Sequence, residues 1–155
     1  MLGVFVKING RSCLVVGGGA VAERKIRALL AEDAVVTVVS PQATAAIRDW
    51  AANGALTWRQ RPYAPGEAAG YFLVIGATNA PAVNKKIHDD GMTSGCLVNI
   101  VDVPELGNFY FPAVVRRGDL TVAVSTAGAC PGLSKRLRRR LEGEFGTAYE
   151  DLLRT

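Results

Sequence analysis

The chain has 155 residues, of which 49% are hydrophobic, 21% charged and 7% aromatic, and its formal net charge is +4. This length fits one domain with a small appendage, and no apolar run reaches the roughly 18 residues that cross a membrane. The three cysteines are widely spaced and form no CxxC pair, which favours a reducing cytoplasm and argues against a structural zinc site.

The first predicted element is a short strand from Val4 to Ile8. Asn9 and Gly10 follow it, and this pair is typical of a tight hairpin turn. Another strand is expected over residues 12–16, where the side chains after the first are all apolar. The opening of the chain therefore predicts a hairpin that leads into a buried strand.

Three glycines follow this strand directly, in the pattern Gly17-x-Gly19-x-x-Ala22. This is the dinucleotide-binding form in which Ala takes the third position. Gly17 permits the tight turn, Gly19 lets a pyrophosphate approach the backbone, and Ala22 lets the following helix pack closely on the strand. That helix is predicted to run to about Ala31, and its unpaired N–H groups and positive dipole end would face the phosphates.

Strands and helices then alternate as far as Pro104. The remaining predicted strands are 35–39, 56–61, 71–75 and 96–101, and the predicted helices are 44–52 and 82–90, the second stopped by Gly91. The alternation predicts an α/β fold: a Rossmann-like parallel sheet with helices on both faces, formed by residues 1–104. Ligands of such sheets bind at the carboxyl ends of the strands, so the loops 17–21 and 76–79 should flank the site.

The pattern changes after Pro104. Two strands and one helix are predicted there, at 109–115, 120–125 and 133–145. Leu133, Leu137 and Leu141 would form the apolar stripe of the helix. Residues 105–155 are too few to bury a core alone, so we expect this second domain to pack on the sheet, on a partner subunit, or on both.

The glycines alone do not choose the cofactor. In NAD-binding domains an acid at the end of the second strand usually holds the ribose hydroxyls, and here that position is Ser40, followed by Pro41 and Gln42. Ser40 or the backbone near Gln42 would then bond the ribose. No arginine that suits a 2′-phosphate occurs before Arg48, so the sequence favours NAD over NADP.

Asp102 is the candidate catalytic carboxylate. It follows a buried strand whose tip should lie near the nicotinamide end of a dinucleotide, where a carboxylate can act as a general base. A cap or turn residue before Pro104 is an equally good interpretation. Asn99, in the same strand, would orient a ligand or satisfy backbone groups.

Other polar residues have simpler interpretations. His88, the only histidine, lies on a predicted helix without a ligand cluster, and we expect it on a solvated face. Ser125 and Thr126 end a strand, and their hydroxyls would touch a ligand or shape the turn. Residues 135–140 hold five cations in six positions, which suits a solvated face, a nucleic-acid contact or an anion site for a polycarboxylate.

Several segments match one family in order and spacing. They are residues 17–25 with the glycine loop, 36–41, 77–84, the run Val98-Asn99-Ile100-Val101-Asp102-Val103-Pro104, 109–113 and 122–131. Together they cover nearly the whole chain and resemble the siroheme synthase N-terminal domains and precorrin-2 dehydrogenases. Two features depart from that pattern: Glu32-Asp33 stands where relatives tend to have glycine, and relatives usually continue beyond Thr155 into a further helical domain that helps cover the substrate.

The resemblance implies a cytoplasmic, homodimeric dehydrogenase that uses NAD to oxidise precorrin-2 to sirohydrochlorin in siroheme or cobalamin biosynthesis. Asp102 matches the family's key catalytic aspartate, and some members also insert iron or cobalt, a step that would otherwise fall to a separate chelatase. We expect no resident metal, nucleic acid or membrane partner. The expected cofactor contacts are Gly17, Gly19, Ala20, Val21, Ser40, Pro41, Gln42, Ala77, Thr78 and Asn99. The expected substrate contacts are Ser125, Thr126, Lys135, Arg136 and Arg139, because precorrin-2 carries many carboxylates.

Two other functions compete with this hypothesis. An NAD-sensing regulatory domain without catalysis would also show a strand, a glycine loop and a helix, but it needs neither the Asp102 segment nor the basic helix. A nucleic-acid-binding module would use residues 135–140 and show a steep salt dependence, although aromatic residues do not interleave with these cations. The enzyme is the leading hypothesis.

Overall fold

The computed structural model describes all 155 residues and divides into two compact units. The sheet unit is Leu2–Phe109, and the hairpin unit is Tyr110–Thr155 with Met1. The division falls after Phe109, whereas the boundary predicted from the sequence lies after Pro104. None of the helices combines the length and the apolar character needed to span a lipid bilayer.

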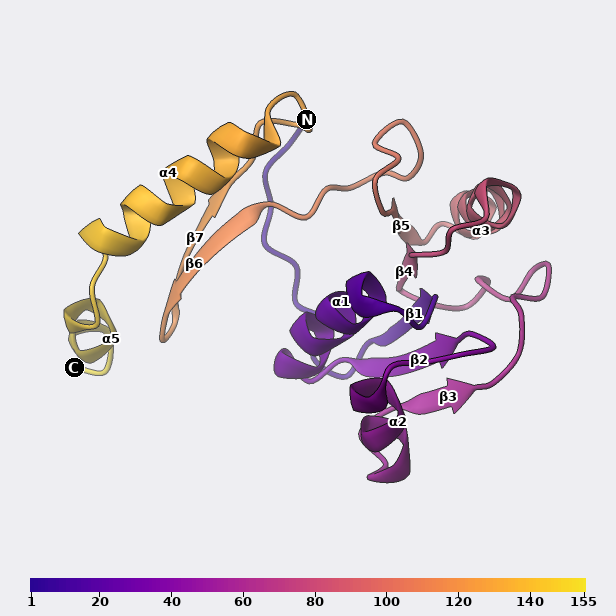
Figure 1. Cartoon of the computed structure of the whole chain (residues 1–155). Coiled ribbons are helices and arrows are strands. Elements are labelled where there is room, and N and C mark those ends of the chain that lie inside the picture. The colour runs from indigo at the N-terminus through magenta and orange to yellow at the C-terminus, as the bar shows by residue number, and fades with distance from the viewer. The chain divides into compact units, whose positions relative to one another are not determined.

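Five parallel strands form the sheet in the order β3-β2-β1-β4-β5 (Figure 1). Their bounds are β1 Ser12–Val16, β2 Val35–Val39, β3 Thr57–Arg59, β4 Leu73–Gly76 and β5 Leu97–Ile100. β1 is central and pairs with β2 on one side and β4 on the other. The strand order reverses at β1, so its carboxyl end lies where ligands of such sheets bind.

Helices cover both faces of this sheet, which confirms the predicted fold. They are α1 Ala20–Ala31, α2 Ala45–Ala52 and α3 Pro81–Thr93. Successive side chains of a strand point to opposite faces. Leu14 shares a core cluster with Ile87 of α3, and its neighbours Cys13 and Val15 are completely buried as well. The face on which Cys13 and Val15 lie is therefore also covered, and α1, which contacts β1 and β2, supplies that layer.

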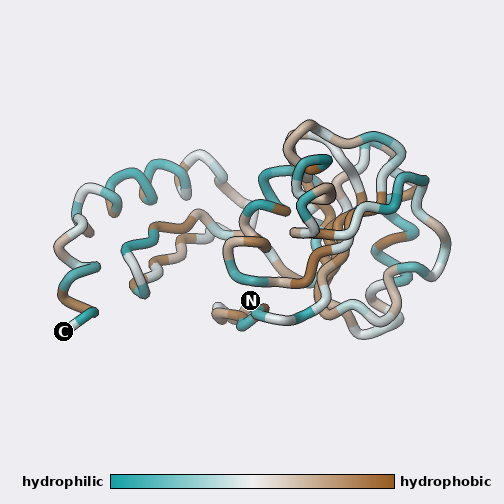
Figure 2. The backbone as a smooth tube through the Cα atoms, turned by 90° about the horizontal axis from the view of Figure 1, so that it is seen from below, coloured by the Kyte–Doolittle hydropathy of each residue, from teal (hydrophilic) through white to brown (hydrophobic).

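The strands form the hydrophobic centre of the sheet unit. Figure 2 shows brown, hydrophobic colour along them and teal over much of the helices. Cys13 and Cys96 are free thiols buried in this core. Burial raises the pKa of the Cys13 thiol to about 11 against a smaller opposing effect of Arg11, so this thiol stays protonated at neutral pH.

The strand predicted over residues 4–8 is absent, and that prediction is wrong. Val4 and Phe5 are 68% and 72% exposed. A hairpin with β1 would need a free edge of β1, and β2 and β4 occupy both edges. The turn at Gly10 is present, because the Arg11 N–H donates to the Ile8 carbonyl at 2.9 Å. The turn signal is local, whereas a strand needs a partner.

Gly91 was predicted to end the helix, and that prediction is wrong, because Gly91 lies buried inside α3. A Cβ on Gly91 would lie 2.5 Å from Cγ2 of Val98 in β5. The glycine therefore permits a close approach of α3 to β5. The left-handed residue that follows α3 is Gly95, with a φ of 74°, a frequent helix ending. Asp33, in the turn before β2, is also left-handed, with a φ of 56°, so an aspartate holds the conformation that glycine would take.

The hairpin unit contains two antiparallel strands and two helices. β6 Ala113–Arg117 pairs with β7 Leu120–Val124, α4 Pro131–Glu144 packs on both strands, and α5 Ala148–Leu153 was not predicted. Arg117, the last residue of β6, connects the hairpin to the end of α4. Its guanidinium donates hydrogen bonds to the Phe145 carbonyl at 2.8 Å and to the Glu142 carbonyl at 3.2 Å.

Glu67 holds the connection between β3 and β4. Its side chain is 5% exposed and forms ion pairs with Arg59 at 3.0 Å and with Arg61. It also accepts the Ala64 N–H at 3.0 Å. The hydrogen bond from Arg61, followed in size by burial acting in the opposite direction, leaves the pKa of Glu67 at about 2.

We expect Glu67→Gln to lower the free energy of unfolding by about 2 kcal/mol at pH 7, because charge-assisted hydrogen bonds are lost. The folded-state pKa lies below the ordinary value, so this stabilisation is complete above about pH 4.5 and is lost as the pH falls toward 2. Urea unfolding at pH 7 and near pH 2.5 should show the difference shrinking. An equal loss at both pH values, or an equal effect of Glu105→Gln, would contradict this role of Glu67.

Candidate functional site

Four backbone hydrogen bonds join the loops at the carboxyl edge of the sheet. In each, the first residue after one strand donates its N–H to the last residue of the neighbouring strand. The pairs are Ser40 to Arg59, Gly17 to Val39, Ala77 to Val16 and Val101 to Gly76, at 3.2, 3.0, 2.8 and 2.9 Å. The loops after β2, β1, β4 and β5 therefore start side by side. The predicted cofactor residues and Asp102 lie in or beside these loops.

The three glycines after β1 have different surroundings. Gly17 has a φ of 128°, and a Cβ there would lie 2.3 Å from the Ala77 carbonyl oxygen. A Cβ on Gly18 would lie 1.9 Å from the Gln42 carbonyl oxygen, whereas nothing lies within 4 Å of a Cβ on Gly19. Gly17 and Gly18 thus permit the close contact of three loops. Gly18 was not among the predicted site residues, because the motif leaves its position open.

The start of α1 suits an anion. Gly19 is the N-cap, and no side chain caps the helix. Gly19 and Ala20 are exposed and Val21 is half-buried, so the first N–H groups and the positive end of the helix dipole face open space. A pyrophosphate fits such a terminus. A side chain on Gly19 would fill that space, so the residues present fit a bound dinucleotide.

Ser40 uses its hydroxyl within the protein. The residue is 7% exposed, and its Oγ donates to the Gln42 carbonyl. The Ser40 carbonyl in turn accepts the Trp58 indole N–H at 3.0 Å. Pro41 and Gln42 are exposed beside it. We therefore expect a ribose contact here from Pro41 and Gln42 rather than from the hydroxyl of Ser40.

Two further candidates also bond to the protein itself. The Thr78 hydroxyl donates to Oδ1 of Asn84 at 2.7 Å and accepts the Ala80 N–H at 3.2 Å. The Asn99 amide donates to the Phe109 carbonyl at 3.1 Å. These bonds shape the start of α3 and the loop after β5. A direct role of Ala77, Thr78 or Asn99 in cofactor binding stays a prediction.

Asp102 is the candidate with an unusual backbone. It is exposed and has a φ of 61°, a left-handed conformation that few residues other than glycine adopt. Such conformations cluster at functional sites, where the surrounding structure imposes them. Here the Val101 bond to Gly76 fixes the chain just before the turn, and Asp102 lies at the edge of the sheet that also carries the glycine loop.

His88 and Asn108 hold the loop that follows Asp102, and neither contact was predicted from the sequence. The Asn108 amide accepts the Val98 N–H at 2.7 Å and donates to the Cys96 carbonyl at 2.9 Å. Nδ1 of His88 accepts the Gly107 N–H at 2.8 Å, and His88 is half-buried. The solvated position expected for His88 is therefore wrong. His88 follows Ile87 directly, but neighbouring residues of a helix lie on different faces, so the sequence held no clear signal for this contact.

The hydroxyls of Ser125 and Thr126 shape a loop of the hairpin unit. Ser125 Oγ accepts the Ala127 N–H at 3.1 Å, and Thr126 Oγ1 accepts the Cys130 N–H at 3.1 Å. Thr126 Oγ1 also lies 3.2 Å from the hydroxyl of Ser134, which is buried in α4. Of the two interpretations that the sequence left open, these bonds fit the turn.

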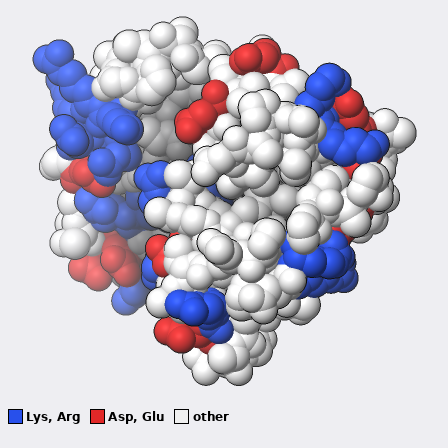
Figure 3. All heavy atoms as spheres, turned by 45° about the vertical axis from the view of Figure 1, so that its right-hand side comes forward, with Lys and Arg blue, Asp and Glu red and all other residues white.

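The cations of α4 divide into two sets. Arg138 and Arg140 form ion pairs with Glu142 and Glu144, one turn further along the helix. Lys135, Arg136 and Arg139 are exposed and form no ion pair. Figure 3 shows a dense group of basic side chains at its upper left. The spacing of the three unpaired cations puts them on the helix face opposite Ser134, where they are open to an acidic ligand.

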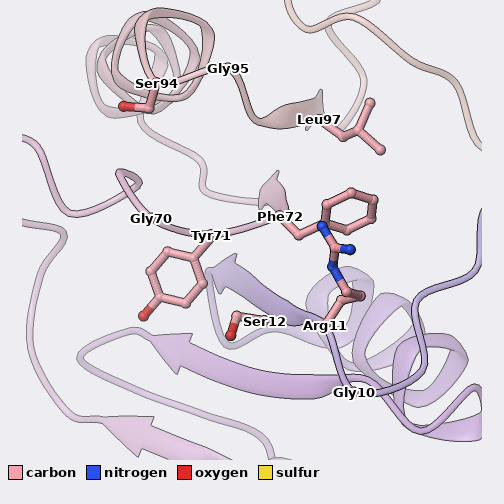
Figure 4. Close-up of a pocket in the computed structure, with 9 residues that line it drawn as sticks. All are labelled: Gly10, Arg11, Ser12, Gly70, Tyr71, Phe72, Ser94, Gly95 and Leu97. Atoms are coloured by element: carbon pink, nitrogen blue, oxygen red, sulfur yellow. The ribbon is translucent and has the colours of Figure 1, made fainter.

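A separate hollow of about 650 Å³ lies at the opposite, amino edge of the sheet. Figure 4 shows the Arg11 guanidinium against the ring of Phe72, and its central carbon lies 4.0 Å from the ring centroid. Gly10, Gly70 and Gly95 line the hollow. It contains none of the predicted site residues.

The fold and its carboxyl edge define a dinucleotide-binding protein of the Rossmann type. A family model described as putative NAD(P)-binding matches residues 4–113, and one described as sirohaem biosynthesis protein central matches residues 117–144. A precorrin-2 dehydrogenase of Priestia megaterium is 38% identical over 149 residues, 96% of this chain and 73% of that protein. The chain therefore belongs to the family of precorrin-2 dehydrogenases and siroheme synthase N-terminal domains.

Other relatives and a solved structure agree with this assignment. Siroheme synthases of Nitrosococcus oceani and Azotobacter vinelandii are 38% and 42% identical over 148 residues, 96% of this chain and 32% of each relative. The chain thus spans about a third of their length. The solved structure described as SirC, precorrin-2 dehydrogenase, matches with a TM-score of 0.86 and 36% identity, over 99% of this chain and 76% of that one.

Alanine at Gly17 should reduce stability, whereas alanine at Gly19 should reduce the affinity for NAD. We expect Gly17→Ala to lower the free energy of unfolding by about 3 kcal/mol, because the Cβ would collide with Ala77 in a conformation that alanine avoids. Gly19→Ala should change stability by less than about 1 kcal/mol but weaken NAD binding at least about tenfold, because the methyl group occupies the phosphate space. Urea unfolding and calorimetric NAD titration measure both, and wild-type NAD affinity of Gly19→Ala would contradict the assignment.

Proposed function

We propose that this chain oxidises precorrin-2 to sirohydrochlorin with NAD as the hydride acceptor. One observation carries the proposal: an exposed carboxylate, Asp102, and an uncapped glycine-loop helix start lie on the same edge of the sheet. Relatives that match almost the whole chain are named for this reaction or for siroheme synthesis. Ser40 stands where an acid would select NAD. The choice of NAD over NADP therefore rests on two points: no arginine suited to a 2′-phosphate occurs before Arg48, and the family uses NAD.

The reaction removes a hydride and a proton from the macrocycle. Bound NAD would supply the acceptor for the hydride. The N–H groups at Gly19 and Ala20 would hold its pyrophosphate, because no side chain caps them. Asp102 accepts the proton on a carboxylate oxygen, or orients the group that accepts it, and then returns the proton to solvent, to which it is exposed.

Asp102→Asn tests the carboxylate with little disturbance, because asparagine also tolerates the left-handed backbone. We expect turnover to fall at least about 100-fold, with NAD affinity unchanged within about twofold. The measurement is anaerobic incubation with precorrin-2 and NAD, followed by sirohydrochlorin absorbance. Glu105→Gln, which removes an exposed carboxylate from the same loop, is the matched control. Wild-type turnover of Asp102→Asn would remove Asp102 from the mechanism.

The same assay separates the alternatives. Tight NAD binding without turnover of precorrin-2 by the wild-type chain would favour a regulatory NAD-sensing domain. Addition of Co²⁺ or Fe²⁺ reports metal insertion as a second activity. In the proposal a separate chelatase takes up the product, and metal-dependent loss of sirohydrochlorin absorbance with this chain alone would contradict that part.

We assign the three unpaired cations of α4 to the carboxylates of the substrate. Arg139→Ala should raise the KM for precorrin-2 about threefold to tenfold with little change in kcat, because it removes one exposed charge contact. Arg140→Ala is the control, since Arg140 already pairs with Glu144. Equal effects of the two variants would show that only the net charge of the helix matters.

The proposed enzyme acts as a homodimer in the cytoplasm. Two apolar surfaces support the dimer: Leu133 and Leu137 of α4 are 44% and 36% exposed, and Val4 and Phe5 are 68% and 72% exposed. Leu133 and Leu137 are one turn apart on the same face of α4, and adjoining exposed apolar side chains are typical of association surfaces. Free, buried thiols at Cys13 and Cys96 suit a reducing compartment. A monomeric mass in sedimentation at micromolar concentration would contradict the dimer.

A further inference from the structure

The two flanks of α1 face different neighbours. On one flank the Glu23 carboxylate accepts the Thr44 hydroxyl at 3.1 Å, and the Arg27 guanidinium lies 5.0 Å from the centroid of the Trp50 ring. Thr44 is the N-cap of α2 and Trp50 lies within it. Because α2 contacts β3, this flank of α1 faces the β2–β3 side of the sheet.

Lys25 lies on the other flank. At 3.6 residues per turn it is about 160° around the helix from Glu23, and the buried Ala22 and Ile26 lie between the two. Lys25 is half-buried, so it borders the contact of α1 with the sheet. Its flank faces the β4–β5 side, where β5 leads into Asp102.

The direction of the Lys25 side chain brings its ammonium group toward the edge of the sheet at which Asp102 lies. Side chains of a helix lean toward its N-terminus, and α1 begins at the carboxyl edge of the sheet, directly after the glycine loop. An electrostatic effect agrees with this geometry. Burial and the neighbouring Arg24 lower the pKa of Lys25, and the carboxylate of Asp102 raises it.

We propose that Lys25 is a positioning residue for Asp102, whose carboxylate it holds in one direction at the carboxyl edge. The proposal rests on the dehydrogenase function proposed above. Asp102 is exposed and lies in the turn directly after β5, so its side chain would otherwise sample several rotamers. A cation anchored in the helix beneath it restricts that freedom, and reactions of this kind depend steeply on the orientation of the reacting groups.

A double-mutant cycle tests this coupling. We expect Lys25→Met, which keeps the length of the side chain, to lower kcat about 10- to 100-fold with the Kd for NAD unchanged, and Lys25→Arg to restore most of the rate. In the Asp102→Asn background, Lys25→Met should cost less than about twofold more, because both changes remove one interaction. Arg24→Met, one residue away and exposed, is the control and should act like wild type.

The proposal would be overturned if the loss of kcat in the double variant equalled the product of the losses in the two single variants. It would also be overturned if Lys25→Met weakened NAD binding without lowering kcat. Either result would mean that Lys25 acts independently of Asp102. An effect of Arg24→Met as large as that of Lys25→Met would also overturn it, because the geometry assigns the interaction to one flank of α1.

A second measurement needs neither substrate nor turnover. Amine-reactive labelling, mapped by mass spectrometry at mildly alkaline pH, reports the neutral fraction of each lysine. Asp102→Asn removes the charge that favours the ammonium form, so labelling of Lys25 should become at least about threefold faster, while Lys85 in α3 keeps its rate. An unchanged Lys25 rate would overturn the pairing, even if the wild-type chain turned out not to oxidise precorrin-2.

Discussion

The close approach of Gly17 to the carbonyl of Ala77 is the constraint on which the carboxyl edge depends. A Cβ at Gly17 would lie 2.3 Å from that oxygen, so any larger residue would separate the loops that follow β1 and β4. The hydrogen bond from Ala77 to Val16 is made in the same place. It is one of the two middle bonds in the row of four, and the last bond of that row, from Val101 to Gly76, fixes the start of the Asp102 turn. The glycine loop and Asp102 are therefore positioned by the same row of backbone hydrogen bonds.

Two kinds of charge occur in this molecule, and they differ in how firmly they are held. Glu67 and Asp102 act from backbone that hydrogen bonds fix on either side, and the cations of α4 project from a solvated helix face. Fixed groups suit a step that needs one geometry, whereas exposed cations suit recognition of a flexible, acidic ligand. The proposed catalytic carboxylate belongs to the first kind, and the proposed substrate contacts of α4 belong to the second.

Patterns local in sequence predicted most of the fold. The apolar strands, the glycine loop and the helix spacing each reflect a residue and its near neighbours, and all five strands of the sheet appear where they were expected. The errors concern tertiary contacts. Residues 4–8 resemble a strand but find both edges of β1 taken. Gly91 resembles a helix stop but lies against Val98, and His88 resembles a surface residue but accepts a hydrogen bond from Gly107. At the site, Gly18 and the hydroxyl of Ser40 show their roles only once the loop at Gln42 is placed.

The left-handed backbone at Asp102 restricts which acid can stand there. Glutamate would carry the same charge, but its longer side chain lacks the short-range bonding by which aspartate tolerates a positive φ, and the conformation costs ordinary residues about 1 kcal/mol. Glycine and asparagine fit the turn and have no acidic group. Aspartate is thus the one residue type that satisfies both the backbone shape and the charge. The turn therefore restricts which residues can occupy this position, independently of any contact with the substrate.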